Sequence, residues 1–291
     1  MNFIKKLFWP ITAPLKFIQE NFKAVVLVVI LIALFAPTEN EQLNTPNLQE
    51  IQLIGAIMDA TEVVEQIDKA SNDENIKGIL LSVDSPGGAV APSIEIAYAI
   101  KRAAEKKPVV VYAKGTLASG SYYASIWADK IIANPGSMVG SIGVILQGSD
   151  LSGLMSKVGI KTQVVHAGKY KEIGTADRPW RDYEINELNK VIQGTYDMFT
   201  KDVANARGLE YKKRDIYANA HIFTAHQAQK VGLVDNVTVM YGAKEQLRVM
   251  AKLSKEEAIW SKEDKFEKFM KKLAATSALT LHTYFPSLVL K

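Results

Sequence analysis

Short apolar runs alternate with longer amphipathic stretches through the middle of the chain. Apolar runs that are rich in β-branched side chains and end at turn residues are typical of buried strands. These runs predict strands at 51–57, 78–83, 109–112 and 130–133. The amphipathic stretches predict helices at 62–70, 93–106 and 120–128. Strands that alternate with helices indicate an α/β fold built from repeated βαβ units.

One long helix is predicted over residues 181–208. Apolar side chains from Ile185 to Phe199 recur there at helical spacing and therefore share one face. Such a face is more typical of core packing or of a subunit contact than of a substrate site.

The amino-terminal region follows another pattern. Residues 24–36 are all apolar and would form a helix of about 20 Å, against a hydrocarbon layer of about 30 Å. Lysines precede this run and acidic residues follow it. The positive-inside rule predicts a cytoplasmic leader at 1–23, a single transmembrane anchor at 24–36 in the inner membrane, and a periplasmic domain. A cleaved signal peptide and a buried core helix are the alternatives.

The rest of the chain divides into three predicted parts. These are a polar linker at 37–50, a folded domain at 51–250 and a carboxy-terminal extension at 251–291. The domain is long enough to bury a single core. The apolar tail at 273–290 is compatible with a second membrane contact, a subunit contact or simple packing.

Composition narrows the possible chemistry. The formal net charge is +4, and no basic stripe is interleaved with aromatic residues, so nucleic-acid binding is not expected. The chain has no cysteine, which excludes a cysteine nucleophile, disulfides and cysteine metal sites. The sequence shows no metal-ligand spacing, so we expect neither a metal nor another cofactor.

Ser119 is the first candidate for chemistry. It follows the apolar run 109–112 and a Gly/Ser-rich turn, which places it at a strand-to-helix junction. A serine there can attack a carbonyl while nearby N–H groups, such as that of Gly120, hold the oxyanion. A serine that only caps the helix is the simpler interpretation.

A serine nucleophile needs a base, and two lysines are candidates. None of the four histidines lies in a pattern that connects it to Ser119. A lysine can serve if burial keeps its amine neutral. Lys169 and Lys171 lie on one side of an extended segment, and spacing alone does not choose between them. A pair of surface lysines in a loop is the simpler interpretation.

The segment D-S-P-G-G at 84–88 follows a predicted strand. Proline fixes one φ angle, and Gly87 and Gly88 permit unusual backbone angles. Such a turn can present N–H groups to a substrate carbonyl, although it can also be an ordinary turn.

Taken together, these motifs resemble the S49 family of serine peptidases, the signal peptide peptidase A (protease IV) group. The resemblance spans residues 50–245. It rests on D-S-P-G-G at 84–88, A-S-G-S-Y-Y-A-S at 118–125, A-D-K-I-I-A-N-P-G-S-M-V-G-S-I-G-V at 128–144, G-K-Y-K-E at 168–172 and F-T-A-H-Q-A-Q-K-V-G-L-V-D at 223–235. It implies a ClpP/crotonase-like superfold with repeated ββα/βαβ units.

The resemblance also implies roles for particular residues. The nucleophile of the family corresponds to Ser119 and the general base to Lys171, with Lys169 as a neighbour. The oxyanion donors correspond to the Gly87/Gly88 turn and the N–H of Gly120.

The chain departs from the family pattern at a few positions. Ser121, Ala220 and Ala225 stand where the family often has glycine, and His221 and His226 where it often has arginine. These departures concern the substrate groove and leave the serine and the lysine unchanged.

Members of the family assemble into rings or domes, and in shorter members the serine and lysine of one site come from neighbouring subunits. The resemblance therefore implies a homo-oligomer anchored in lipid that degrades signal-peptide remnants and other apolar peptides. A related S49 protease directed at membrane proteins would have almost the same sequence. A crotonase-type acyl-CoA enzyme and a non-catalytic membrane scaffold are the rival interpretations.

Overall fold

The computed structural model describes residues 19–27 and 45–261. The chain divides into two compact units, and the larger one runs from Pro46 to Trp260. In the smaller unit, residues 22–27 are helical. Among the described residues, no helix has the length and apolar character needed to cross a membrane. Most of the predicted anchor, the leader up to residue 18, and the extension from residue 262 onward lie outside the described residues.

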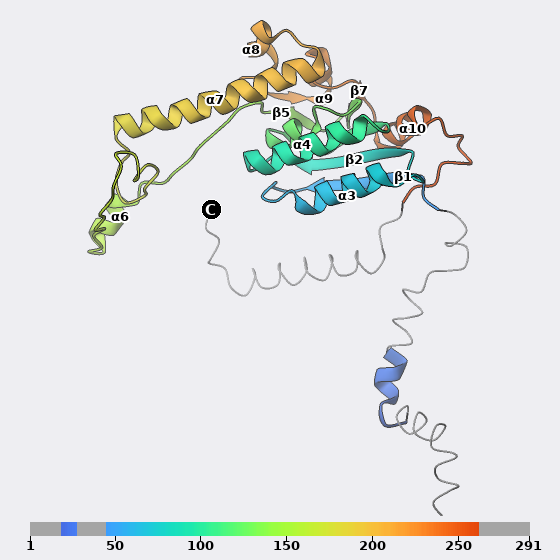
Figure 1. Cartoon of the computed structure of the whole chain (residues 1–291), viewed down its shortest axis with the longest axis horizontal. Coiled ribbons are helices and arrows are strands. Elements are labelled where there is room, and N and C mark those ends of the chain that lie inside the picture. Colours follow the sequence, from blue (N-terminus) through green and yellow to red (C-terminus); the bar gives the residue numbers. More distant parts are fainter. Residues whose placement is uncertain (1–18, 28–44, 262–291) are drawn as a thin grey trace, which may run out of the picture. The chain divides into compact units, whose positions relative to one another are not determined.

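The larger unit is built on one seven-stranded sheet (Figure 1). Strands β1 to β4, β5 and β7 pair in parallel in the order β1-β2-β3-β4-β7, with β5 beside β3, and β6 joins β5 antiparallel. The strands are β1 Leu48–Ile54, β2 Gly78–Ser85, β3 Val109–Ala118, β4 Lys130–Ala133, β5 Met138–Gly140, β6 Ile222–Thr224 and β7 Asn236–Val237.

Helices cover the sheet and extend beyond it. They are α3 Thr61–Asn72, α4 Val90–Ala104, α5 Gly120–Ser125, α6 Ser152–Lys157, α7 Asp182–Arg207, α8 Arg214–Tyr217, α9 Ala225–Lys230 and α10 Met240–Met250. A 3₁₀ turn at Tyr211–Lys213 precedes α8. The mixture of parallel strands and helices confirms the predicted α/β class.

Both faces of the sheet are buried, as expected for parallel strands. In β2, Ile79 and Leu81 belong to the larger apolar cluster, whereas Leu80 between them belongs to a second cluster that includes Ala243 and Leu247 of α10. This alternation follows from the two-residue period of a strand. It explains why β2 reads as a continuous apolar run.

Within residues 45–261 every predicted strand and helix is present, but several boundaries differ. The first strand begins at Leu48, because its residues pair with β2 from that point. The third strand continues to Ala118, beyond its apolar run, because it leaves β4 and pairs with β5 over its last residues. The helix after Ser119 ends at Ser125, three residues earlier than predicted.

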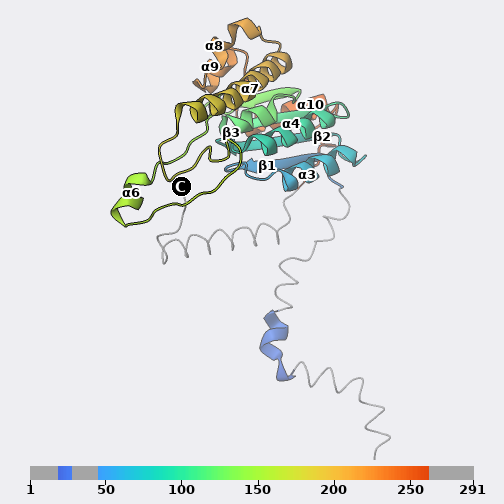
Figure 2. The same ribbon diagram turned by 60° about the vertical axis from the view of Figure 1, so that its left-hand side comes forward.

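Residues 141–181 form an arm that leaves the sheet after β5 and returns through α7. Figures 1 and 2 both show this arm, which contains α6, projecting beyond the sheet with the first half of α7. With 26 residues, α7 is about 39 Å long. Its last third packs on the core through Phe199 and Val203, whereas Ile185 and Val191 in its first half are exposed. The predicted apolar face of α7 therefore packs on the core only near its carboxy-terminal end.

Candidate active site

Ser119 lies at a sharp junction between a strand and a helix, as predicted. β3 ends at Ala118, α5 begins at Gly120, and Ser119 between them has φ 54° and ψ −123°. A positive φ in a residue with a side chain costs about 1–3 kcal/mol and persists only where the surroundings enforce it. Here the Ser119 N–H donates to the carbonyl of Gly140 at 2.8 Å, which ties the turn to β5. Other hydrolases present a nucleophilic serine on a strained turn of this kind.

The hydroxyl of Ser119 does not cap the helix. The carbonyl of Ser119 accepts the N–H of Tyr123 at 3.0 Å, but its side chain makes no capping hydrogen bond. A capping serine turns its oxygen onto the N–H groups of the first helical turn. The simpler interpretation of this residue is therefore wrong, and its half-buried hydroxyl is left for other chemistry.

The glycine turn after β2 lies directly against Ser119. Gly87 has φ +94°, and a Cβ placed on it would lie 2.5 Å from the nitrogen of Gly120 and 2.9 Å from the Cβ of Ser119. Gly88 forms an isolated bridge with Ile57, and a Cβ there would lie 2.2 Å from the Ile57 carbonyl oxygen. Because the backbones approach this closely, only glycine fits at either position. The structure thus brings Ser119 together with all three glycines of the predicted oxyanion site.

Two of these glycines have N–H groups that find no acceptor within residues 45–261. They are Gly88 and Gly120, and a Cβ on Gly120 would lie 3.2 Å from the Gly88 nitrogen, so the two are neighbours. The Gly87 N–H differs, because it donates to the hydroxyl of Ser85 at 3.2 Å. The geometry favours Gly88 and Gly120 as a pair of donors, with Gly87 forming the turn that brings them together.

Ser121 is a supporting residue whose role the sequence did not show. Its buried hydroxyl accepts the N–H of Ala118 at 2.9 Å and donates to the carbonyl of Ser85 at 2.7 Å. These bonds join the end of β3 to the end of β2 beside the nucleophile. The sequence marked Ser121 only by its departure from the family pattern. Its hydrogen-bond partner Ser85 lies 36 residues earlier, so no local spacing connects the two residues.

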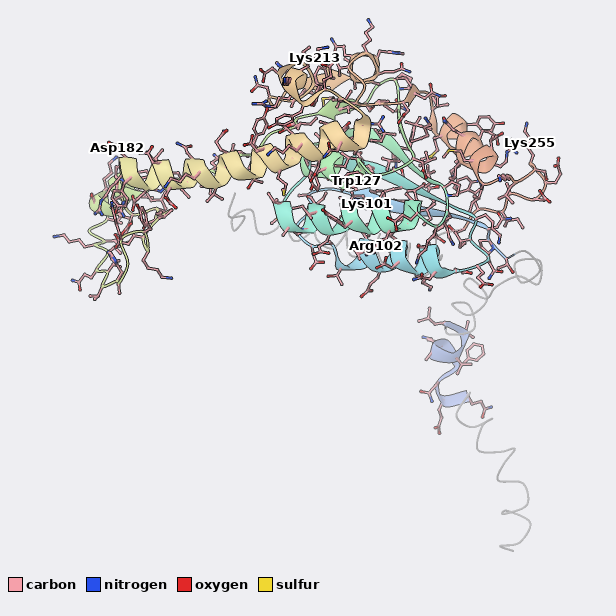
Figure 3. The ribbon with its side chains drawn as sticks, turned by 45° about the horizontal axis from the view of Figure 1, so that its top comes forward. Lys101, Arg102, Trp127, Asp182, Lys213 and Lys255 are labelled. Atoms are coloured by element: carbon pink, nitrogen blue, oxygen red, sulfur yellow. The ribbon has the colours of Figure 1, made fainter. Side chains whose placement is uncertain are left out.

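Lys171 lies elsewhere, at the outer part of the arm. It is exposed, and its backbone N–H closes a tight turn onto the carbonyl of Gly168 at 3.2 Å. The adjacent Tyr170 packs edge-on against Tyr183 in the first turn of α7, with ring centroids 5.6 Å apart. Figure 3 shows the start of this helix, at Asp182, far from Lys101 on α4 and from Trp127.

Contacts at two points along α7 show how far apart the two predicted catalytic residues, Ser119 and Lys171, lie. Tyr123, one turn after Ser119, contacts Phe199 at a centroid distance of 5.0 Å. Phe199 follows Tyr183 by sixteen residues, which is about 24 Å along a helix. A general base must come within about 3 Å of its proton donor. Within one chain, therefore, Lys171 does not reach Ser119.

The surroundings of the two candidate lysines differ. The ammonium of Lys169 lies over the ring of Tyr183 at 4.7 Å and over that of Tyr170 at 5.4 Å. Ring faces attract a cation, so these contacts hold the Lys169 side chain against the two rings. Within the described part of the arm, the side chain of Lys171 has neither an ion pair nor a ring contact. Of the two side chains, that of Lys169 is the one held by ring contacts on this part of the arm.

An ion network surrounds the turn that carries Lys171. Arg178 donates two bonds of 2.8 Å to the carboxylate of Glu184, which is fully buried, and one of 3.1 Å to Glu172. The Arg178 guanidinium and the N–H of Arg181 lower the pKa of Glu184 to about 2. His166 lies 3.8 Å from the Glu172 carboxylate. The sequence motifs did not point to the network that these residues form.

The described residues contain no cluster of three or more histidine, aspartate or glutamate side chains arranged to hold a metal ion. The chemical groups at the site are the Ser119 hydroxyl and the N–H groups of Gly88 and Gly120.

A strained serine beside paired N–H donors on an α/β sheet defines the class of acyl-transfer hydrolases. The model of peptidase family S49 matches residues 101–254. The chain belongs to peptidase family S49, a family of serine peptidases, as the sequence motifs predicted.

Two relatives support this membership. A putative protease of Methanocaldococcus jannaschii is 41% identical over 201 residues, which cover 69% of this chain and 65% of that protein. A putative signal peptide peptidase, SppA, of Enterococcus faecium is 33% identical over 201 residues, 68% of this chain and 58% of that protein. The chain thus spans less than two thirds of either relative.

Among solved structures, a ClpP1 mutant of Listeria monocytogenes aligns with a TM-score of 0.47 and 18% identity, over 67% of this chain and 93% of that chain. At this level of similarity, the ClpP/crotonase-like superfold stays a prediction.

Proposed function

We propose that this protein is a membrane-anchored serine endopeptidase that uses Ser119 as nucleophile and Lys171 as general base. Its substrates would be signal-peptide remnants and other apolar peptides at the outer side of the inner membrane. The observation that carries the proposal is the strained Ser119, whose uncapped hydroxyl lies beside the N–H groups of Gly88 and Gly120.

The chemistry follows from these groups. Neutral Lys171 accepts the proton of the Ser119 hydroxyl while the oxygen attacks the scissile carbonyl. The N–H groups of Gly88 and Gly120 stabilise the negative charge that develops on the carbonyl oxygen. Lys171 then returns the proton to the leaving amine, and water hydrolyses the acyl-serine by the same steps in reverse.

The base comes from a neighbouring copy of the chain. Two features support this shared site: the gap of about 24 Å along α7 and the apolar surface of the arm. Large apolar side chains that no neighbour covers gather on the arm, and a contact with a second copy would bury them. They include Ile145, Leu154, Val158, Ile160 and Val165. A head-to-tail contact of this kind closes into a ring when its rotation permits.

The preference for apolar peptides is supported near the glycine turn. Met58 follows Ile57, the residue bridged to Gly88, and its side chain is 73% exposed. Val90, two residues after Gly88, is also exposed. Side chains of this kind bind aliphatic peptides by burial, at about 25 cal/mol per Å² of apolar surface.

Complementation between two inactive variants tests the shared site. Ser119→Ala and Lys171→Ala are purified separately and also co-expressed with different tags, as full chains in detergent. Each is assayed on an apolar signal-peptide-like peptide. Each variant alone is expected to be inactive. Random mixing is expected to restore about one quarter of wild-type activity. Only a site that takes its serine from a Lys171→Ala chain and its lysine from a Ser119→Ala chain is active.

The outcomes separate the parts of the proposal. Activity of the mixture supports both the dyad and its sharing. Two inactive variants and an inactive mixture would reject the shared site, and with it the assignment of Lys171 as the base for Ser119. Full activity of Ser119→Ala would reject the peptidase site itself, and binding of coenzyme A would then favour an acyl-CoA enzyme.

A further inference from the structure

We propose that Ser93 is a positioning residue for the oxyanion site: its hydroxyl group sets the position of Gly120, and with it the separation between the N–H groups of Gly88 and Gly120. The proposal rests on the function proposed above, in which these two groups stabilise the oxyanion. Ser93 acts through Gly120 and is not itself a catalytic residue.

Ser93 lies in the first turn of α4, the helix that follows the glycine turn. Its side chain is only 2% exposed. Its Oγ donates to the carbonyl of Ala89 at 2.8 Å, and its N–H donates to the same carbonyl at 3.3 Å. A serine hydroxyl has a single proton, so the bond to Ala89 leaves none for an oxyanion. Ser93 can therefore affect the site only through the groups that it contacts.

The hydroxyl oxygen of Ser93 rests against the Cα of Gly120. A Cβ placed on Gly120 would collide with this oxygen and would lie 3.2 Å from the Cβ of Ser93. The oxygen thus fills the space that a side chain at residue 120 would take, and only glycine fits there. Since α5 begins at Gly120, the start of this helix packs directly on the Ser93 hydroxyl.

The same hydroxyl is connected to both proposed donors. Gly88 is followed directly by Ala89, whose carbonyl accepts the proton of the Ser93 hydroxyl. Gly120 packs on the oxygen of that hydroxyl, and the Cβ position of Gly120 lies 3.2 Å from the Gly88 nitrogen. A change in the Ser93 side chain therefore alters the separation of the two N–H groups that would hold the oxyanion.

Helix stability alone does not account for a serine at this position. A serine hydroxyl that bonds back to the carbonyl four residues earlier slightly destabilises a helix, and alanine is the better helix former. Alanine is also smaller than serine, so it would fit the same space. It lacks only the oxygen atom that contacts Gly120.

The test compares kcat with KM for an apolar peptide, measured on full-length protein in detergent. In Ser93→Ala, Gly120 loses the atom on which it packs, so the two N–H groups are no longer held at their separation. Because such donors act on the transition state, we expect kcat to fall about tenfold or more and KM to stay within about twofold. Ser93→Thr keeps a hydroxyl that can bond to the same carbonyl, so it should recover most of the lost kcat.

Ser125→Ala is the matched control. Ser125 is fully buried, and its hydroxyl makes the same kind of bond, to the carbonyl of Ser121 at 2.8 Å. It ends α5, five residues after Gly120, which is about 7.5 Å along a helix. Its kcat should stay at the wild-type value, and urea unfolding should show that both alanine variants are folded.

Three results would overturn the proposal. They are equal kcat in Ser93→Ala and Ser125→Ala, a higher KM with unchanged kcat in Ser93→Ala, and no recovery of kcat in Ser93→Thr. If Ser93→Ala does not fold, Ser93→Cys replaces it. Its sulfur is larger than oxygen and a weak hydrogen-bond donor, so it should displace Gly120 and lower kcat in the same way.

Failure of the proposed function gives a different result. If Ser119→Ala keeps full activity, Ser119 is not the nucleophile, and the oxyanion site loses its role together with Ser93. If Ser119→Ala is inactive and the kcat of Ser93→Ala equals that of wild type, only the role of Ser93 fails.

Discussion

Replacing Gly87 with alanine tests the oxyanion geometry. Gly87 has φ +94°, and its new Cβ would lie 2.5 Å from the nitrogen of Gly120 and 2.8 Å from the carbonyl oxygen of Ala118. Both neighbours are backbone atoms on either side of Ser119. The substitution therefore separates the glycine turn from the nucleophile without adding any polar group.

The expected magnitude has two parts. Alanine at a strongly positive φ costs about 1–3 kcal/mol of folding free energy. Packing the extra methyl group into a tight site costs about 1–3 kcal/mol more. To reach ordinary contact, the Cβ and the Gly120 nitrogen must move apart by about 1 Å. Because a misplacement of about 1 Å, or the loss of one oxyanion donor, lowers kcat about 10²-fold or more, we expect a loss of that size.

Gly55→Ala is the matched control. Gly55 also has a positive φ, of +78°, but a Cβ there would meet nothing within 4 Å. It should therefore lose the conformational part of the stability and keep its kcat. Urea unfolding of the purified proteins measures the stabilities, and single-turnover hydrolysis of an apolar peptide measures the chemical step.

One result would refute this reasoning. If Gly87→Ala is folded and its kcat stays within about tenfold of that of Gly55→Ala, the pair of N–H groups at Gly88 and Gly120 does not stabilise the transition state. A loss of stability without a loss of kcat would leave Gly87 with a purely structural role.

Two other predictions concern stability. The ammonium of Lys107 donates to three backbone carbonyls at and after the end of α3, at 2.8–2.9 Å. Lys107→Ala should therefore lower the free energy of unfolding by about 1.5–3 kcal/mol, measured by urea titration. The peptidase rate of the folded protein should not change. Arg178 lowers the pKa of Glu184 from 4.5 to about 2, so the stabilisation that this carboxylate provides is complete above pH 4.5 and is lost as the pH falls toward 2. Urea unfolding at several pH values should show wild type losing stability over that range more steeply than Glu184→Gln; equal slopes would contradict the assignment.

Much of the sheet could be predicted from the sequence because both of its faces are buried. The strands then appear as apolar runs such as that of β2, and the helices between them as amphipathic stretches. Boundaries were less accurate, since they depend on partners. β3 continues past its apolar run to Ala118 because β5, twenty residues later, pairs with it.

Only the part of the site around Ser119 could be predicted from the sequence. Ser119 and its glycines lie in turns that follow predicted strands, so the topology of the sheet brings them together at one edge. No such rule applies to the arm. Residues 141–181 contain little regular structure, and their spacing does not show that Lys171 lies near the start of α7, away from Ser119. Arg178 and Glu184 were missed because an ion pair six residues apart, at the start of a helix, looks like ordinary surface charge.

The two parts of the proposed site are each held in place by contacts within the chain. Ser119 is fixed by the Gly140 carbonyl and the neighbouring glycines, and the turn of Lys171 by the attachment of Arg178 to α7. Ordering flexible groups during association would reduce both affinity and precision. Under the proposed shared site, docking of two copies would only have to bring the amine within reach of the hydroxyl. A single copy would then hold a strained serine without a base, and peptide hydrolysis would depend on assembly.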